Sequence, residues 1–177
     1  SMAESRRAEV PNFTGGEAAS ITAQGNPYVF RTSFGQSISF PKLARYIAGK
    51  YKTLAVIYVN NDFGKGGRDA IAKSLEGSAT KIVADISTDA GQVDFSAAVL
   101  KAKQSNADAL FVYTNEEESA RALRELRKQG WSKPVVGDDV ARLLNDRPAR
   151  PWESLQVAGL ARSGLDADKC AAFVAAV

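Results

Sequence analysis

The chain has 177 residues, 45% of them hydrophobic, with 23 basic and 20 acidic side chains and a formal net charge of +3. This length suits one well-filled core, or one lobe and part of a second, and the scattered charges give no electrostatic case for binding nucleic acid. The sequence contains no histidine and a single cysteine, Cys170, which excludes a histidine base, a Cys-His pair, an internal disulfide and a Cys/His zinc site.

The beginning of the chain is polar. Its opening Ser-Met is typical of a tag remnant, and residues 1–9 lack the apolar stretch of a signal peptide, so we interpret them as a tag or a disordered start. Residues 10–26 are rich in Gly, Ser, Thr and Asn, which indicates a loop or the edge of another unit. No apolar run approaches the roughly 20 residues needed to cross a bilayer, and we expect no direct membrane insertion.

Helical and strand patterns alternate in the middle of the chain. Apolar residues at helical spacing predict a helix over residues 39–50, and a continuous apolar run predicts a strand over 54–59 that is covered on both faces. After a glycine-rich turn, the pattern predicts a helix over 68–75 and a second strand over 81–86.

The alternation continues towards residue 137. Asp94 can cap the next helix, and residues 108–113 form the third predicted strand. Asn115 and Glu118 have the spacing of a capping box, which predicts a helix from there to Gly130, followed by a short strand over 134–137. Helices that alternate with buried strands predict an α/β fold, with an open parallel sheet and helices on both faces.

The glycine-rich turn contains Gly64, Gly66 and Gly67 just before a predicted helix. Backbone N–H groups at a helix N-terminus could bind a phosphate. The spacing, however, matches neither G-x-G-x-x-G nor the P-loop pattern, so the geometry of a tight turn explains these glycines better.

Four polar residues follow predicted strands. Asp62 and Asn115 come after the first and third strands, and Asp138 and Asp139 after the fourth. Because the carboxyl ends of parallel strands meet at one sheet edge, these side chains could converge on one ligand crevice. The alternative is that each carboxylate caps a helix or forms a turn.

Acidic residues 116–118 open a predicted helix, where the helix dipole favours negative charge without a metal. The sequence supplies no recognisable nucleophile or oxyanion motif. We therefore expect a protein that is not an enzyme and that uses no cofactor and no metal.

Four motifs, in order, resemble the periplasmic amino-acid-binding proteins of ABC transporters, particularly the branched-chain (leucine/isoleucine/valine) type. They are NPYVFRTSFGQS, LAVIYVNNDFGKGG, the stretch from VDFSAAVL to ELRKQG, and PVVGDD. The pairing of an Arg-Thr-Ser crossover with an Asp-Phe-Gly-x-Gly turn is typical of type I periplasmic binding folds. Such proteins have two α/β lobes joined by crossover strands, and they trap an amino acid between the lobes as these close.

The resemblance implies a division of this chain. Residues 10–36 correspond to a first-lobe remnant and hinge crossover, and residues 37–139 to the ligand-binding second lobe, a Rossmann-like unit. Residues 140–177 form an atypical C-terminal extension, with a final helix that Asp166 can cap. A second lobe on its own would make half of the ligand contacts, so we expect weak or no binding by this chain alone.

The resemblance also implies ligand-binding residues. Phe63 matches the aromatic residue of the turn that packs against the ligand, and Asn115 matches a position after the third strand that faces it. Asp139, or Asp138 in a register shifted by one, matches the acidic residue that pairs with the ligand's ammonium group. In the first-lobe segment, the residues that match the part holding the ligand carboxylate are Gly16, Glu17 and Ala18.

The leading hypothesis is an extracytoplasmic solute-binding protein, or a fragment of one, that captures an amino acid or a similar small polar ligand. Its implied partner is the membrane permease of an ABC transporter, and its implied location is periplasmic or extracellular. A ligand-sensing domain of a receptor or regulator with the same fold is the alternative, and an α/β enzyme is a third reading with no motif to support it.

Overall fold

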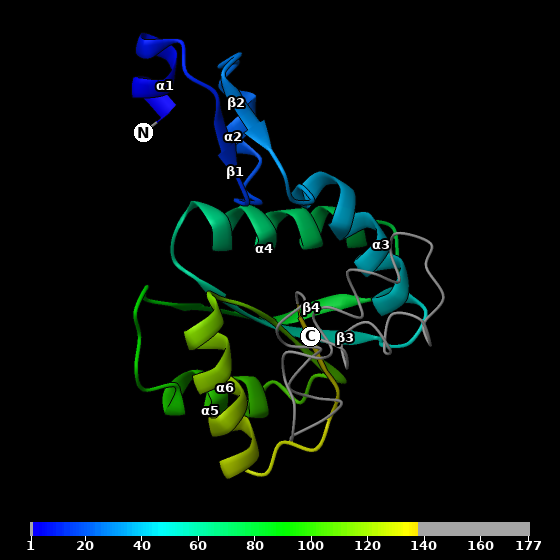
Figure 1. Cartoon of the computed structure of the whole chain (residues 1–177). Helices are drawn as coiled ribbons and strands as arrows, with labels where there is room; N and C mark the ends of the chain where they lie inside the picture. Colours follow the sequence, from blue (N-terminus) through cyan, green and yellow to red (C-terminus); the bar gives the residue numbers. More distant parts are fainter. Residues whose placement is uncertain (1, 138–177) are drawn as a thin grey trace, which may run out of the picture.

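The computed structural model describes residues 2–137, in which a four-stranded parallel sheet lies between two pairs of helices (Figure 1). The elements in chain order are α1 (Met2–Ala8), β1 (Asn12–Thr14), α2 (Ser20–Ala23), β2 (Val29–Arg31), α3 (Gln36–Ala48), β3 (Thr53–Val59), α4 (Asp62–Leu75), β4 (Lys81–Thr88), α5 (Ser96–Gln104), β5 (Ala109–Tyr113), α6 (Glu116–Lys128) and β6 (Val135–Gly137). The predicted α/β class, with a parallel sheet covered on both faces, is confirmed.

The main sheet has the strand order β4-β3-β5-β6, and every neighbouring pair is parallel. Strands β3 and β5 lie at its centre, which explains why both are continuous apolar runs in the sequence. Along β5, every residue from Ala109 to Tyr113 is buried. The four strands predicted from the sequence agree with the observed ones to within two residues.

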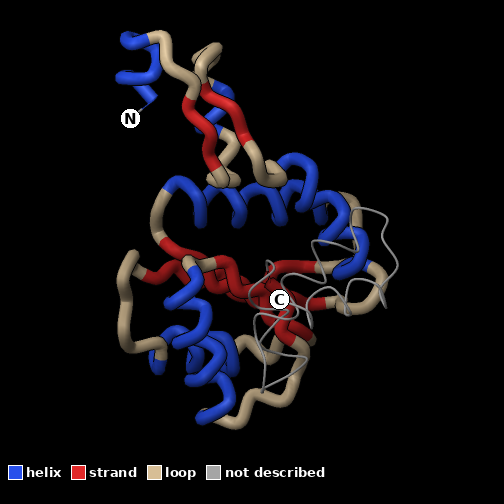
Figure 2. Tube along the Cα trace, in the orientation of Figure 1, coloured by secondary structure: helices blue, strands red, loops and turns tan. Residues whose placement is uncertain are grey.

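Helices cover both faces of the main sheet (Figure 2), and the side chains of each central strand point alternately to the two helical layers. Leu54 and Val56 of β3 pack in one core cluster with residues of α3 and α4. Ala55 and Ile57 pack in a second cluster with residues of α5 and α6. The period of two along β3 therefore gives the sheet two separate apolar cores.

Helix α4 begins at Asp62, six residues before the predicted start at residue 68. The glycine-rich stretch is thus the first turn and a half of a helix instead of a turn before one. Asn61 is the N-cap, and its Oδ1 accepts a hydrogen bond of 2.9 Å from the N–H of Gly64. This cap offsets the low helix propensity of three glycines.

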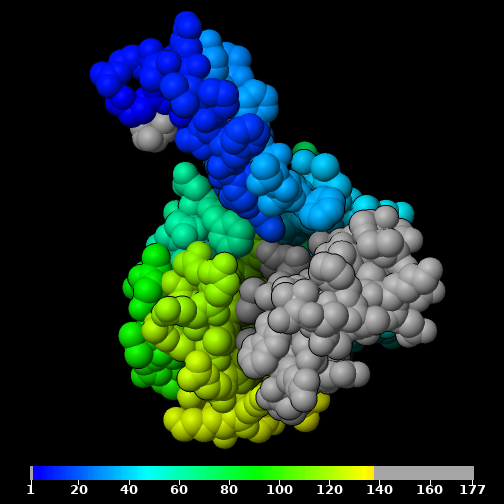
Figure 3. All heavy atoms as spheres, viewed as in Figure 1, coloured from blue at the N-terminus to red at the C-terminus, as the bar shows by residue number. Residues whose placement is uncertain are grey.

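The first 31 residues contain more regular structure than the sequence predicts. Residues 2–8 form α1 where a tag or disordered start is expected, and Asn26 Nδ2 donates to the carbonyl oxygen of Met2 at 2.7 Å. Strands β1 and β2 pair in parallel in a separate two-stranded sheet. This N-terminal part projects from the main body of the molecule (Figure 3). Each of these short strands is stabilised by pairing with a segment 17 residues away in the sequence. The local Gly/Ser-rich composition does not predict this pairing.

No helix between residues 2 and 137 is long and apolar enough to cross a membrane. The expected final helix after Asp166 and the atypical extension 140–177 lie outside the described residues.

Candidate functional site

The candidate site lies at the carboxyl edge of the main sheet, between β3 and β5. These two strands are neighbours, yet the chain leaves β3 towards β4 on one side and enters β6 from β5 on the other. This reversal of strand order opens a crevice beyond the strand ends, which is where open α/β sheets bind ligands. A cavity of about 340 Å³ is found there, a size suited to a small molecule.

Three segments far apart in the sequence line this cavity. They are the loop after β1 with the start of α2, the first turn of α4, and the end of β5 with the start of α6. The lining residues are Gly15, Gly16, Glu17, Ala18, Ile21, Phe63, Val112, Thr114, Asn115, Glu116 and Ser119.

Five of the seven predicted ligand-binding residues are brought together in this lining, namely Gly16, Glu17, Ala18, Phe63 and Asn115. The other two, Asp138 and Asp139, lie outside the described residues. Asp62, which could have joined them in one crevice, is an exposed residue in the first turn of α4 and does not line the cavity.

Phe63 is held in place by a stack of aromatic rings. Its ring lies against that of Tyr113, with centroids 4.3 Å apart and planes at 26°. Tyr113 in turn stacks on Phe111 at 5.6 Å and meets the edge of Phe40 at 5.2 Å. Since Tyr113 is buried, the stack gives Phe63 a rigid base, and Phe63 presents a fixed apolar wall to the cavity.

The glycines of α4 serve helix–sheet packing. A Cβ atom on Gly64 would lie 1.9 Å from the carbonyl oxygen of Val59, and one on Gly67 would lie 2.0 Å from Cε1 of Tyr113. Both glycines are buried, and no other residue fits at either position. Close approach of α4 to β3 and β5 therefore explains them without a phosphate.

Arg31 fixes the loop that forms the opposite wall. From β2, its guanidinium donates to the carbonyl oxygens of Gly16 and Ala18, both at 2.9 Å, and to Oγ1 of Thr22 at 3.0 Å. Three acceptors on one planar cation define the shape of this loop.

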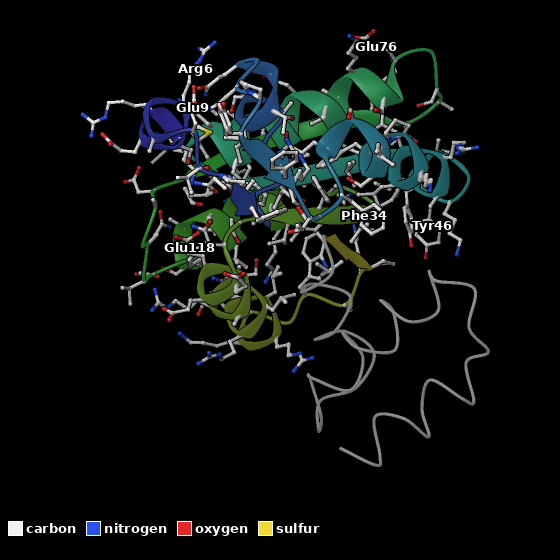
Figure 4. The ribbon with its side chains drawn as sticks, turned by 45° about the horizontal axis from the view of Figure 1, so that its top comes forward. Arg6, Glu9, Phe34, Tyr46, Glu76 and Glu118 are labelled. Carbon is white, nitrogen blue, oxygen red and sulfur yellow. The ribbon has the colours of Figure 1, made fainter. Side chains whose placement is uncertain are left out.

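The start of α6 forms the third wall, and its predicted capping box is present. The Glu118 carboxylate accepts from the backbone N–H of Asn115 at 3.1 Å and from its Nδ2 at 2.9 Å. Glu118 lies at the beginning of α6 (Figure 4), and the capping box fixes Asn115 at the cavity. A hydrogen bond of 2.8 Å joins the buried hydroxyls of Thr114 and Ser119 behind it.

Sequence reasoning missed the hydroxyl residues of this wall. Ser119 lies four positions after Asn115, so the helical period could have placed both on one face of α6. Thr114 follows the last residue of the buried strand β5, and Ile21 comes from a helix of four residues that the composition does not reveal. Among residues 2–137, no group of three or more Cys, Asp or Glu side chains is arranged to hold a metal ion.

The chain matches a known protein family over residues 3–176. A family model described as periplasmic binding protein matches residues 3–176. The chain belongs to the periplasmic binding protein family. The resemblance predicted from the four motifs is confirmed, and the matched residues include most of the segment after Asp139 that the sequence marks as atypical.

Two curated relatives of this chain are both named as binding proteins for leucine, isoleucine and valine. The Leucine-, isoleucine-, valine-, threonine-, and alanine-binding protein of Pseudomonas aeruginosa is 26% identical over 124 residues, which are 69% of this chain and 33% of the relative. The Leu/Ile/Val-binding protein of Escherichia coli is 27% identical over the same share of this chain and 34% of its own length. The chain thus spans about a third of the length of the curated relatives it matches. These relatives are binding proteins, in agreement with the prediction of a protein that is not an enzyme.

Solved structures show the same fold. A leucine-binding protein from Thermotoga maritima matches with a TM-score of 0.68 and 21% identity, over 79% of this chain and 41% of that chain. An ABC-transporter solute-binding protein from R. palustris, in complex with 4-hydroxybenzoate, matches with a TM-score of 0.75 and 19% identity, over 83% of this chain and 41% of that chain. The described part of the chain therefore has the architecture of one lobe of a type I periplasmic binding protein.

Proposed function

We propose that this chain provides the second lobe of an extracytoplasmic solute-binding protein, which captures an amino acid or a similar small polar ligand and delivers it to an ABC-transporter permease. The observation that supports this proposal most is the cavity at the β3/β5 edge, whose lining contains Gly16, Glu17, Ala18, Phe63 and Asn115. In this proposal, residues 10–36 form the first-lobe remnant and hinge crossover, and residues 37–139 the ligand-binding lobe.

The charges of the cavity favour an ammonium-bearing ligand. Its described lining includes two carboxylates, Glu17 and Glu116, and no lysine or arginine. An ammonium group removed from water needs a carboxylate partner, and an amino acid has such a group whereas a benzoate has none. The carboxylate that both ligands carry does not distinguish them. The difference in the ammonium group favours an amino acid over the aromatic acids that are bound in some structural relatives.

Capture without bond chemistry is the proposed mechanism. Phe63 provides a fixed apolar surface, Asn115 provides amide hydrogen bonds, and Asp139 or Asp138 is proposed to pair with the ligand's ammonium group. The ligand would favour the closed arrangement of the lobes because some contacts exist only there. A location in the periplasm or outside the cell belongs to the same proposal.

Titration followed by two-dimensional ¹H–¹⁵N NMR tests the proposal, because it detects the weak binding expected of this chain. We expect L-leucine, L-threonine or L-alanine to shift the amide signals of Glu17, Phe63 and Asn115, and 4-hydroxybenzoate to leave them unchanged. Phe63→Ala should abolish these shifts. The matched control is Tyr46→Ala, which removes an aromatic residue of α3 (Figure 4) that is 48% exposed and does not line the cavity.

Two results would contradict the proposal. One is that no amino acid shifts these signals while 4-hydroxybenzoate does. The other is that shifts caused by amino acids are the same in the Phe63→Ala variant as in the unmodified chain.

A further inference from the structure

Gln36 lies behind the cavity, between two of its walls. It is the first residue of α3, it does not line the cavity, and its side chain is only 3% exposed. The loop that contains Glu17 lies on one side of it and the first turn of α4 on the other. A buried amide in this place must find partners for its polar atoms, and its partners are a wall residue, Phe63, and Tyr113 of the buried strand β5.

The chemistry of the partners determines the direction of the hydrogen bonds around Gln36. Its Nε2 donates to the carbonyl oxygen of Phe63 at 2.9 Å and to the hydroxyl of Tyr113 at 3.1 Å. A carbonyl oxygen can only accept, so the nitrogen and not the oxygen of the amide faces Phe63. Because the Tyr113 oxygen accepts from Gln36, its own proton is available for another acceptor. That acceptor is Oε2 of Glu17, at a long 3.4 Å.

Two further contacts fix Gln36 itself. Its backbone N–H donates to the carbonyl oxygen of Glu17 at 3.3 Å, which is a second connection to the same loop. A Cβ atom added to Gly66 would lie 2.9 Å from Oε1 of Gln36, so α4 packs closely against the amide. Gln36 therefore contacts the loop of Glu17 and the helix of Phe63 at the same time.

We propose that Gln36 is a positioning residue, which holds the Glu17 loop and the Phe63 turn at a set separation before any ligand arrives. A site whose walls are already in place loses less conformational entropy when the ligand binds. As a role in a ligand site this inference rests on the proposed function. The hydrogen-bond chain from Gln36 through Tyr113 to Glu17 is a property of the ligand-free chain and can be tested without a ligand.

Hydrogen–deuterium exchange of the ligand-free chain, read in peptides that cover residues 12–22 and 60–68, tests the inference. Gln36→Met keeps the length of the side chain and removes both donors, so we expect exchange to rise about tenfold in both peptides. Gln36→Glu should have the same effect at pH 7, because a carboxylate cannot donate to Phe63 and would draw the Tyr113 proton away from Glu17. Tyr113→Phe should raise exchange in residues 12–22 and leave residues 60–68 nearly unchanged, since the bond to Phe63 remains.

The matched control is Gln129→Met. The Gln129 amide also joins two elements, since its Nε2 donates to the carbonyl oxygen of Ser96 at 3.1 Å, but it lies at the end of α6 away from the cavity. We expect this variant to change exchange around Ser96 and not in either wall peptide.

The inference is overturned if Gln36→Met and Gln36→Glu leave both wall peptides as they are, or raise exchange equally throughout residues 2–137. It is also overturned if Tyr113→Phe affects residues 60–68 as strongly as residues 12–22. If the exchange pattern is as expected but no amino acid binds in the NMR titration, the positioning role stands for the cavity and the proposed function fails.

Discussion

The Glu118 carboxylate accepts a hydrogen bond of 2.6 Å from the backbone N–H of Gly91, 27 residues earlier in the chain. Glu118 also completes the capping box with Asn115, and the residue is only 3% exposed. One buried carboxylate therefore joins the loop between β4 and α5 to the start of α6, beside the candidate site.

Glu118→Ala should lower the free energy of unfolding by about 2–4 kcal/mol, because several backbone and amide donors lose their charged acceptor in a buried place. Urea denaturation measures this change. Glu117→Ala is the matched control, since that side chain is 84% exposed and pairs, within residues 2–137, only with Arg121, and a change below about 0.5 kcal/mol is expected there. Equal effects of the two substitutions would contradict a special role for Glu118.

Gly67→Ala should destabilise the lobe by about 1–3 kcal/mol or more. The added methyl would lie 2.0 Å from the ring of Tyr113, and that ring is buried between Phe63 and Phe111 and has no room to move. Thermal unfolding gives the measurement. Gly49→Ala, at a helix C-cap where the nearest atom would be at an ordinary 3.5 Å, should leave the melting temperature nearly unchanged.

Asp108 makes stability depend on pH. Hydrogen bonds from the side chain and backbone of Thr53, together with the N–H of Lys52, hold the pKa of the Asp108 carboxyl below its ordinary value. A pKa that is lower in the folded than in the unfolded chain stabilises the folded state above the unfolded pKa of about 3.9, and this contribution is lost as pH falls through the folded pKa.

Asp108→Asn should accordingly lower the urea midpoint at pH 7 and lower it much less at pH 3. Glu76→Gln, which alters an exposed carboxylate on the outer surface (Figure 4), should leave the pH 7 midpoint close to that of the unmodified chain. If Asp108→Asn lowers the urea midpoint as much at pH 3 as at pH 7, the ionisation of Asp108 does not cause the pH dependence of stability.

Arg31→Lys should loosen the loop of residues 15–22, although the charge is kept. An ammonium cannot reproduce the planar contacts of the guanidinium to Gly16, Ala18 and Thr22. Limited proteolysis should cut this loop faster in Arg31→Lys and faster still in Arg31→Ala. Arg124→Ala, at an exposed position on α6, provides the control. If the loop is cut as fast in Arg124→Ala as in the Arg31 variants, Arg31 does not hold the loop in place.

The sequence was a good guide wherever a structure depends on neighbours along the chain. The buried runs of β3 and β5 and the Asn115–Glu118 capping box follow from local spacing, and both are confirmed. The reason for Gly67 depends instead on Tyr113, 46 positions later, and no local pattern records that contact. Helix α4 likewise begins earlier than predicted because the Asn61 cap and packing on the sheet overcome the low propensity of glycine.

The candidate site was reached by a different route. Glu17 and Phe63 came from the family resemblance, and Asn115 came both from the resemblance and from its place after a predicted strand. The structure places all three around one cavity. The buried residues behind them, Gln36 and Tyr113, were not predicted, because a polar residue at the start of a helix and an aromatic residue in a strand have ordinary local explanations. Only the folded arrangement shows that they contact each other.

Tyr113 meets two demands at once, since its ring supports Phe63 within the core and its hydroxyl joins the chain from Gln36 to Glu17. A substitution that removes both the ring and the hydroxyl would change the packing of the lobe and the shape of its cavity. Evolution towards a new ligand is therefore expected to proceed through lining residues outside the main sheet, such as Ile21 and Glu116, which can vary without disturbing the sheet. The same reasoning recommends those positions as the first to randomise in a library that aims to redirect specificity.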